Sequence, residues 1–163
     1  MEIAILLYPR FTALDAMGPL EVLSSLHGAK VRLVAEEAGP VTNDTGLLTV
    51  QVGTPLAEVP APDLVLVPGG PGCFAAMQSE PLRAWLRQAH ATSRFTTSVC
   101  TGSLILGAAG LLTGVPATTH WGSLADLAPL GATPVRECFV RHERIITAAG
   151  VSAGIDMALW LVR

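Results

Sequence analysis

The sequence predicts a single α/β domain over residues 1–163, built on a mostly parallel sheet with helices on both faces. Three observations indicate this fold class. Short apolar runs of strand length alternate along the chain with segments whose apolar residues recur at helical spacing. Half of the residues are apolar and only 14% are charged, as expected when the central strands are buried on both faces. Neither a repeat nor a linker divides the chain.

The first part of the chain predicts two strands, one helix and a hairpin. Glu2–Tyr8 is a continuous apolar run that ends before Pro9, which is typical of a central parallel strand. Leu14–Leu26 carries leucine or methionine at every third position and predicts a helix. Val31–Ala35 predicts a second strand. The turn residues within Gly39–Val52 predict a small β-hairpin excursion from the main sheet.

The alternation of strands and helices continues to the end of the chain. Two short apolar runs predict buried strands at Leu64–Val67 and Phe95–Val99, each followed by a helix, at Pro81–Ala91 and Thr101–Leu112. The remaining predicted elements are a short strand at Ala117–Thr119, a short helix at Trp121–Leu127, a β-pair at Val135–Val140 and Arg144–Ala148, and a helix at Ser152–Arg163, within which the chain ends.

Charge and cysteine content exclude several classes of function. The formal net charge is −3 and the basic residues are scattered singly, so nucleic-acid binding by this chain is not expected. No apolar window reaches the length of a membrane span, and the acidic N-terminus is unlike a signal peptide, so we expect a cytoplasmic protein. Three cysteines without a CxxC spacing predict neither a disulfide framework nor a metal site. No cofactor is expected.

Cys100 is the residue that the local sequence marks for chemistry. It lies between a predicted strand and a predicted helix, and small residues flank it at Ser98 and Gly102. This pattern is typical of a nucleophile elbow, a tight turn that presents the reactive side chain at the edge of the sheet. A helix N-terminus beneath the thiol is expected to lower its pKa. The other two cysteines, Cys73 and Cys138, are expected to pack as small hydrophobic residues.

Ligand sites of parallel sheets lie at the carboxyl ends of the strands, and this rule selects the candidate partners of Cys100. Asp15 follows the first strand among apolar residues, where it is either a helix cap or a poorly hydrated acid with a raised pKa. Gly70 follows another strand, and its N–H and that of Thr101 are candidates to bind negative charge on a substrate. His120 is either a base for the thiol or a structural residue beside it.

Four sequence blocks and the segment around Asp15 together resemble a known family. The blocks are Val67–Gly70, Val99–Ser103, Thr118–Trp121 and Ala149–Ala158, and the additional segment is Leu14–Val22. They resemble the ThiJ/PfpI superfamily, whose members share a class I glutamine amidotransferase-like, flavodoxin-like three-layer fold. The segment around Asp15 points to the branch that contains isonitrile hydratases and the sensor domains of AraC-type regulators.

The resemblance implies a site and an activity. The cysteine, threonine and early aspartate of isonitrile hydratases correspond to Cys100, Thr101 and Asp15, and this match favours a catalytic role for Asp15 over a helix cap. The residue after the cysteine is Thr101, whereas the protease branch has histidine there, so proteolysis is not expected. We therefore expect hydration of a small isocyanide to an N-substituted formamide through a thioimidate-like adduct on Cys100.

Two alternatives remain open at this stage. The domain is alternatively a non-catalytic sensor, in which Cys100 reports oxidation or a bound small molecule. A further alternative is another thiol-based hydrolase or an aldehyde-detoxifying activity, both of which occur in the superfamily. In every case the expected partner is a small molecule. The resemblance also implies a homodimer.

Overall fold

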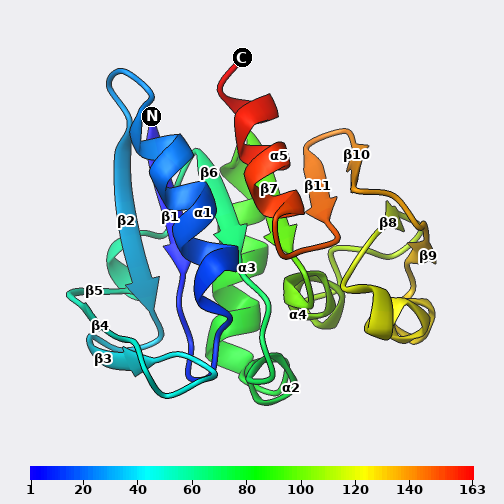
Figure 1. Cartoon of the computed structure of the whole chain (residues 1–163), viewed down its shortest axis with the longest axis horizontal. Helices are drawn as coiled ribbons and strands as arrows, with labels where there is room; N and C mark the ends of the chain where they lie inside the picture. Colours follow the sequence, from blue (N-terminus) through cyan, green and yellow to red (C-terminus); the bar gives the residue numbers. More distant parts are fainter.

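The computed structural model describes residues 1–163 and has a seven-stranded sheet at its centre (Figure 1). The strand order is β10–β11–β7–β6–β1–β2–β5, and β10 alone runs antiparallel to its neighbour. The strands span β1 Glu2–Leu6, β2 Lys30–Ala35, β5 Thr54–Pro55, β6 Leu64–Val67, β7 Phe95–Val99, β10 Phe139–His142 and β11 Ile145–Ala148. The predicted mostly parallel sheet is confirmed.

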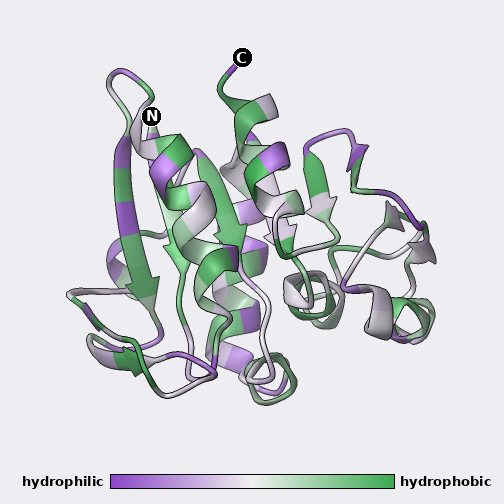
Figure 2. Cartoon of the chain, viewed as in Figure 1, coloured by the Kyte–Doolittle hydropathy of each residue, from purple (hydrophilic) through white to green (hydrophobic).

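The central strands are buried on both faces, which explains their continuous apolar sequences. Every residue of β6 is buried, and so is every residue of β1 after Glu2. In Figure 2, β6 is hydrophobic along its length, whereas β2, nearer the edge, alternates between hydrophobic and hydrophilic residues. Burial of these apolar side chains is the main favourable contribution to folding.

Helices cover both faces of the sheet (Figure 1). On one face α1 (Ala13–Ser24) and α5 (Ala153–Leu161) lie side by side. The other face carries α2 (Cys73–Ala76), α3 (Glu80–Thr92) and α4 (Gly102–Ala108). Glycine allows the close approach of α1 to α5, because a Cβ added at Gly18 would lie 2.8 Å from Ile155 Cγ1.

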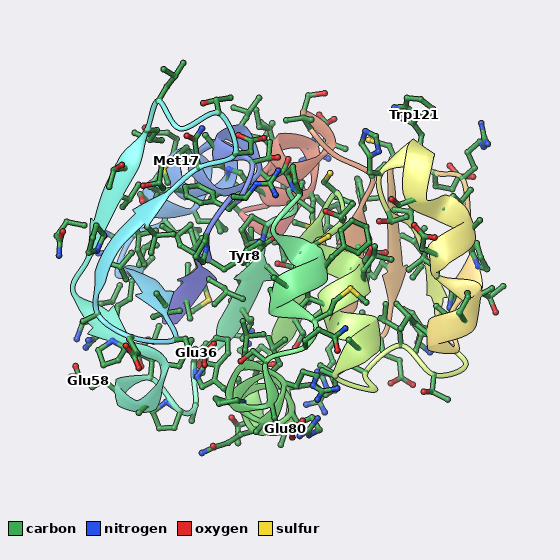
Figure 3. The ribbon with its side chains drawn as sticks, turned by 90° about the horizontal axis from the view of Figure 1, so that it is seen from below. Tyr8, Met17, Glu36, Glu58, Glu80 and Trp121 are labelled. Atoms are coloured by element: carbon green, nitrogen blue, oxygen red, sulfur yellow. The ribbon has the colours of Figure 1, made fainter.

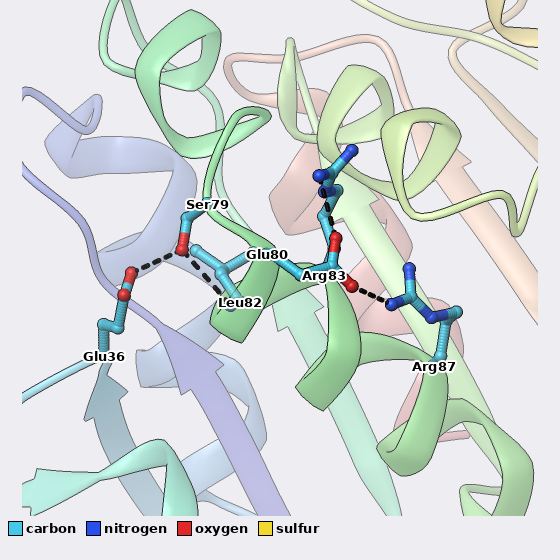
Figure 4. Close-up of polar contacts among 6 residues, drawn as sticks. All are labelled: Glu36, Ser79, Glu80, Leu82, Arg83 and Arg87. Carbon is cyan, nitrogen blue, oxygen red and sulfur yellow. Dashed lines mark hydrogen bonds and ion pairs between the residues drawn. The ribbon is translucent and has the colours of Figure 1, made fainter.

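The start of α3 shows how local sequence sets a helix end (Figure 4). Ser79 is the N-cap residue, and its hydroxyl accepts a hydrogen bond from the N–H of Leu82 at 3.3 Å. The same hydroxyl donates to Glu36, in the loop after β2, at 2.8 Å. Glu80 forms ion pairs with Arg83 and Arg87 on the exposed side of the helix. The cap therefore also ties α3 to the neighbouring strand end.

The predicted hairpin is present, and some predicted boundaries in the second half are wrong. The hairpin consists of β3 (Gly39–Thr42) and β4 (Thr49–Val52), which pair antiparallel. The helix predicted to reach Leu112 ends at Ala108, because Gly110 adopts a left-handed φ of +83° that terminates it.

The segment between α4 and β10 also differs from the prediction. The short strand β8 (Pro116–Ala117) pairs with β9 (Thr133–Pro134) in a separate two-stranded sheet. The predicted short helix is the 3₁₀ helix η2 (Trp121–Asp126), and the strand predicted from Val135 begins only at Phe139. The N–H of Val135 instead donates to Ala117 O beside β8, which keeps this stretch away from the main sheet. Two further 3₁₀ turns, η1 (Leu56–Glu58) and η3 (Ala128–Leu130), were not predicted.

Chain topology determines where the loops that carry the candidate site meet. From β1 the chain proceeds to β2 and β5 on one side, then returns to β6 on the other side of β1. The loops after β1 and β6 therefore lead to helices on opposite faces of the sheet at this switch point, where ligands bind in sheets of this kind. Figure 3 views the molecule toward the edge of the sheet at which the parallel strands have their carboxyl ends, and Tyr8 is labelled near the centre of this view. None of the helices has the length and apolar character that crossing a membrane requires.

Candidate active site

Cys100 occupies a strained turn between β7 and α4. Its φ is +56°, in the left-handed region that residues with a side chain rarely adopt. The Cys100 N–H donates to the Ala148 carbonyl oxygen of β11 at 2.9 Å, which anchors the turn to the sheet. Two glycines make room for it, because a Cβ added at Gly69 or Gly150 would lie 2.7 or 2.6 Å from the Cys100 Cβ. The turn therefore has the geometry of the predicted elbow.

Asp15 lies in the first turn of α1, is fully buried, and faces the elbow. Its Oδ2 accepts a hydrogen bond from the Gly69 N–H at 3.1 Å. The Cys100 thiol lies close enough to lower the pKa of this carboxyl group. No hydrogen-bond partner lies near Oδ1. Burial, the larger effect, raises the pKa of Asp15 from 3.8 to about 7, against the opposing effects of the Gly69 N–H and the Cys100 thiol. The carboxyl group is bonded to another loop and not to its own helix end, so the helix-cap alternative is wrong.

The expected low pKa of the Cys100 thiol is also wrong. Burial and the negative charge of Asp15 raise this pKa to about 12, although the Thr101 N–H favours the thiolate. The side chain is only 6% exposed, and α4 below it has only seven residues. Loss of hydration therefore outweighs the helix N-terminus. The Cys100 thiol therefore keeps its proton at neutral pH.

Thr101 and Gly70, which lie beside Cys100, are hydrogen-bonded to each other. The Gly70 N–H donates to the Thr101 hydroxyl at 2.9 Å, and that hydroxyl lies 3.3 Å from the Gly70 carbonyl oxygen. The Gly70 N–H is thus directed at a side chain, whereas the Thr101 N–H lowers the pKa of the Cys100 thiol. Gly70 has a φ of +132°, and a Cβ there would lie 2.5 Å from the Arg10 carbonyl oxygen. Glycine at this position allows the loops after β1 and β6 to touch.

His120 is not brought into contact with the thiol. Its Nδ1 accepts a hydrogen bond from the Gly122 N–H at 3.2 Å, and its ring lies 5.3 Å from that of Trp121. The residue of this segment that reaches the elbow is Thr119, whose hydroxyl donates to the Cys100 carbonyl oxygen at 2.9 Å. The arrangement makes His120 a cap of η2.

Sequence reasoning assigned no role to two further residues that border the site. The Tyr8 hydroxyl donates to the Pro68 carbonyl oxygen at 2.7 Å, and burial raises its pKa well above the usual value. Cys73 is fully buried, and this burial raises the pKa of its thiol, against a smaller opposing effect of the Thr101 side chain. The position of Tyr8 at the carboxyl end of a strand was the one signal that could have found it. Cys138, expected to pack, is exposed.

Two pockets lie near these residues. One, of about 470 Å³, is lined by the ends of β1 and β2, the β3 strand and α2, and includes Tyr8. The other, of about 320 Å³, is lined by Thr119 and Ala149, which flank the elbow, and by Trp121. No group of three or more histidine, cysteine, aspartate or glutamate side chains is arranged to hold a metal ion. The buried groups that could exchange a proton at this site are the Cys100 thiol and the Asp15 carboxyl group.

The sequence and fold match known proteins over the full chain. The chain is 44% identical over 163 residues to an isonitrile hydratase from Pseudomonas putida, covering 100% of this chain and 71% of that protein. It is 31% identical to the HTH-type transcriptional regulator CdhR from Pseudomonas aeruginosa, covering 96% of this chain and 48% of the regulator. A crystal structure of a ThiJ/PfpI family protein from Pseudomonas syringae superposes with a TM-score of 0.95 at 41% identity, over 99% of this chain and 67% of that one.

These matches agree with the architecture described above. The sheet, its two helical layers and the elbow form the flavodoxin-like fold that the resemblance implied. The chain spans about half the length of the regulator, so the match to that protein concerns one part of it. The family model described as the DJ-1/PfpI family matches residues 1–163. The chain belongs to the DJ-1/PfpI family.

Proposed function

We propose that this protein hydrates a small isocyanide to an N-substituted formamide, with Cys100 as the nucleophile. The observation that carries the proposal is that Cys100, on the strained elbow, and Asp15 are buried together and act on each other's pKa. The full-length likeness to an isonitrile hydratase supports the reaction class. A thiol that keeps its proton needs a base beside it, and Asp15, with a pKa of about 7, is matched to that task.

The first half of the reaction transfers one proton from sulfur to carbon. As the Cys100 sulfur bonds to the terminal carbon of R–N≡C, its proton passes to the Asp15 carboxylate. The protonated Asp15 then gives this proton to the same carbon, and the product is the adduct R–N=CH–S–Cys100. Asp15 returns to the carboxylate form, stabilised by the Gly69 N–H.

The second half adds water and releases the enzyme. Asp15 accepts a proton from a water molecule while the water oxygen bonds to the adduct carbon, and Asp15 then passes this proton to the nitrogen. The resulting R–NH–CH(OH)–S–Cys100 breaks its C–S bond while Asp15 moves the hydroxyl proton to the departing sulfur, which releases R–NH–CHO and restores the thiol. The sum is addition of one water to the isocyanide. The Thr101 N–H, which favours the thiolate of Cys100, stabilises negative charge on the sulfur during both halves.

The test is formamide production from a simple aliphatic isocyanide, measured with the parent protein and with Cys100→Ala. Turnover by the parent that disappears in Cys100→Ala supports the proposal. The matched control is Cys138→Ala, which removes the exposed thiol and is expected to retain full activity. Turnover that survives in Cys100→Ala would contradict a role for this thiol as nucleophile.

A sensor function is the second candidate, and the likeness to CdhR favours it. In that case Cys100 or a pocket beside it reports a small molecule without turnover. Asp15→Asn separates the two candidates. Hydration requires the proton transfer and is expected to fall at least a hundredfold in this variant, whereas ligand binding measured by calorimetry is expected to persist in a sensor.

The proposal extends to assembly and location. We expect the protein to act as a homodimer on a small-molecule substrate, as the family resemblance implied. Its three cysteines are free, which suits the reducing conditions of the cytoplasm.

A further inference from the structure

Two buried hydrogen bonds meet on one peptide group beside the candidate site. The Tyr8 hydroxyl donates to the carbonyl oxygen of Pro68 at 2.7 Å. The N–H of the same peptide group belongs to Gly69 and donates to Asp15 Oδ2 at 3.1 Å. The Pro68–Gly69 peptide group therefore links the Tyr8 hydroxyl to the Asp15 carboxylate. In this way the loop after β6 connects the end of β1 to the first turn of α1.

We infer that Tyr8 is a positioning residue for Asp15. Its hydroxyl orients and polarises the Pro68–Gly69 peptide group, and the N–H of this peptide group binds the Asp15 carboxylate. The inference rests on the proposed function, because it concerns the group that exchanges protons with Cys100 there. It assigns no substrate contact to Tyr8. The hydroxyl acts on Asp15 only through the peptide group between them.

Hydrogen-bond cooperativity gives the direction of the effect. A donor on a peptide oxygen draws electron density toward that oxygen and makes the N–H of the same peptide a stronger donor, by 10–30% per bond in approximate estimates. The Gly69 N–H stabilises the charged form of Asp15 and lowers its pKa. The Tyr8 hydroxyl therefore favours the carboxylate, which is the form that accepts the thiol proton.

The geometry isolates this effect from packing. Tyr8 is buried, its ring lines the pocket of about 470 Å³, and its hydroxyl supplies the only hydrogen bond to the Pro68 carbonyl oxygen. Tyr8→Phe keeps the ring and removes only the donor. The Pro68–Gly69 peptide then loses the hydrogen bond that orients and polarises it, while the contact from the Thr12 N–H to the Gly69 carbonyl oxygen is retained.

The titratable groups that act on Asp15 come from three places. Cys100 lies on the elbow, Tyr8 at the end of β1, and Asp44 in the β3–β4 hairpin, where the Thr12 hydroxyl donates to it at 3.0 Å. Burial leaves Tyr8 protonated far above neutral pH, so its hydroxyl is a neutral donor throughout the range in which Asp15 titrates. Asp44 is present in both the parent and Tyr8→Phe. A difference between the two proteins therefore reports the hydroxyl.

The first experiment is a carboxyl-carbon NMR titration of Asp15 in the parent and in Tyr8→Phe, with the signal assigned by its loss in Asp15→Asn. The pKa of Asp15 is expected to rise by about half a pH unit in Tyr8→Phe. The matched control is Thr97→Val, which removes another buried hydroxyl that donates to a carbonyl oxygen of β6, that of Val65, at 2.8 Å. Its Asp15 titration is expected to match the parent, and thermal unfolding checks that both variants fold.

The second experiment is the pH profile of kcat/KM for isocyanide hydration. In Tyr8→Phe the acid limb is expected to move to higher pH, with about a threefold loss at pH 6 and little loss at pH 9. A purely structural role would lower kcat/KM equally at all pH values. An unchanged Asp15 titration in Tyr8→Phe overturns the inference. An absence of turnover in the parent, combined with a shifted Asp15 titration, overturns the proposed reaction but leaves the role of Tyr8 intact.

Discussion

At the scale of single residues, the properties of Asp15 and Cys100 follow from being buried together. Burial, the largest effect, raises the pKa of both groups. The charge of Asp15 raises the pKa of Cys100 further, whereas the Cys100 thiol lowers the pKa of Asp15. At neutral pH the Cys100 thiol is therefore protonated, and the neighbouring Asp15 carboxyl group is near its titration midpoint. This combination suits a site that transfers protons, whereas it does not suit a site that keeps a thiolate at rest.

The buried Asp15 makes stability depend on pH. The folded group has a pKa of about 7 and the exposed group one of 3.8, so between these values the folded protein holds a proton that the unfolded chain has released. The free energy of unfolding therefore falls as the pH rises from 4 to 7. The Asp15→Asn variant has no titrating group at this position, so its stability lacks this dependence on pH. The difference in unfolding free energy between the variant and the parent is therefore expected to shift in favour of the variant by about 2 kcal/mol when the pH is raised from 5 to 8. Urea denaturation at both pH values measures this difference. An equal difference at the two pH values would contradict the raised pKa.

The three thiols are expected to react at different rates. Cys138 is exposed, Cys100 is nearly buried with a pKa of about 12, and Cys73 is fully buried with a raised pKa. Thiolates are the reactive form, so iodoacetamide at pH 7.5 is expected to label Cys138 first, then Cys100, and Cys73 only on unfolding. Peptide mass spectrometry over time measures the order. Labelling of Cys100 before Cys138 would indicate a thiolate on the elbow and favour the redox-sensor alternative.

At the scale of elements, the site depends on how closely three loops approach one another. The loop after β6 passes the elbow with no room for a side chain, since a Cβ at Gly69 would lie 2.6 Å from the Thr101 nitrogen. The loop after β1 is held to it by the hydrogen bond from the Thr12 N–H to the Gly69 carbonyl oxygen at 2.8 Å. The peptide groups of Gly69 are thus fixed on both sides, and they in turn hold Asp15.

Gly69→Ala tests this close approach. The added methyl group meets backbone atoms that cannot rotate away, so the loop must move and the Gly69 N–H is displaced from Asp15. Stability is expected to fall by about 2 kcal/mol, and isocyanide hydration is expected to fall with it. Gly53→Ala is the matched control, because no atom lies within 4 Å of a Cβ at that position. Chemical denaturation and activity assays measure both variants. Equal stability and equal activity of Gly69→Ala and Gly53→Ala would show that the loop after β6 can accommodate a methyl group at Gly69.

At the scale of the whole molecule, the sheet brings together segments that are far apart in sequence. The candidate site combines residues from the loops after β1, β6, β7 and β11, and only a parallel sheet places these four loops at one edge. The two helical layers leave large apolar side chains partly uncovered, among them Leu14 on α1 and Leu159 on α5, each 46% exposed. Exposed apolar side chains of this kind favour association between copies.

The proposed homodimer has a direct measurement. Sedimentation equilibrium at several protein concentrations is expected to give twice the 16.9 kDa mass of one chain. Burial of apolar surface between copies is expected to make the dimer persist at high salt, which screens charges and not hydrophobic contacts. The upper concentration of the assay is about 100 μM. If the measured mass stays that of one chain up to this concentration, the protein is not a dimer under these conditions.

The fold class and the principal candidates could be inferred from local sequence. Strand and helix periodicity is a property of neighbouring residues, and so are the small residues around Cys100 that mark a tight turn. The alternation of elements then required a mostly parallel sheet, whose strand ends pointed to Asp15 and Gly70. Short elements such as β5 and α2 lay below what periodicity detects, because two to four residues do not complete a pattern.

Tertiary structure alone decided the electrostatics and the partners. The pKa of Cys100 depends on burial and on the charge of Asp15, which is 85 positions away in the chain, so the local prediction of a low value was wrong. The bond from Tyr8 to Pro68 spans 60 positions and has no local signature. His120 stands in the sequence as a candidate base, but its ring caps η2 instead. A sequence pattern records which side chains are available, whereas hydration and distance, which set what they can do, exist only once the chain has folded.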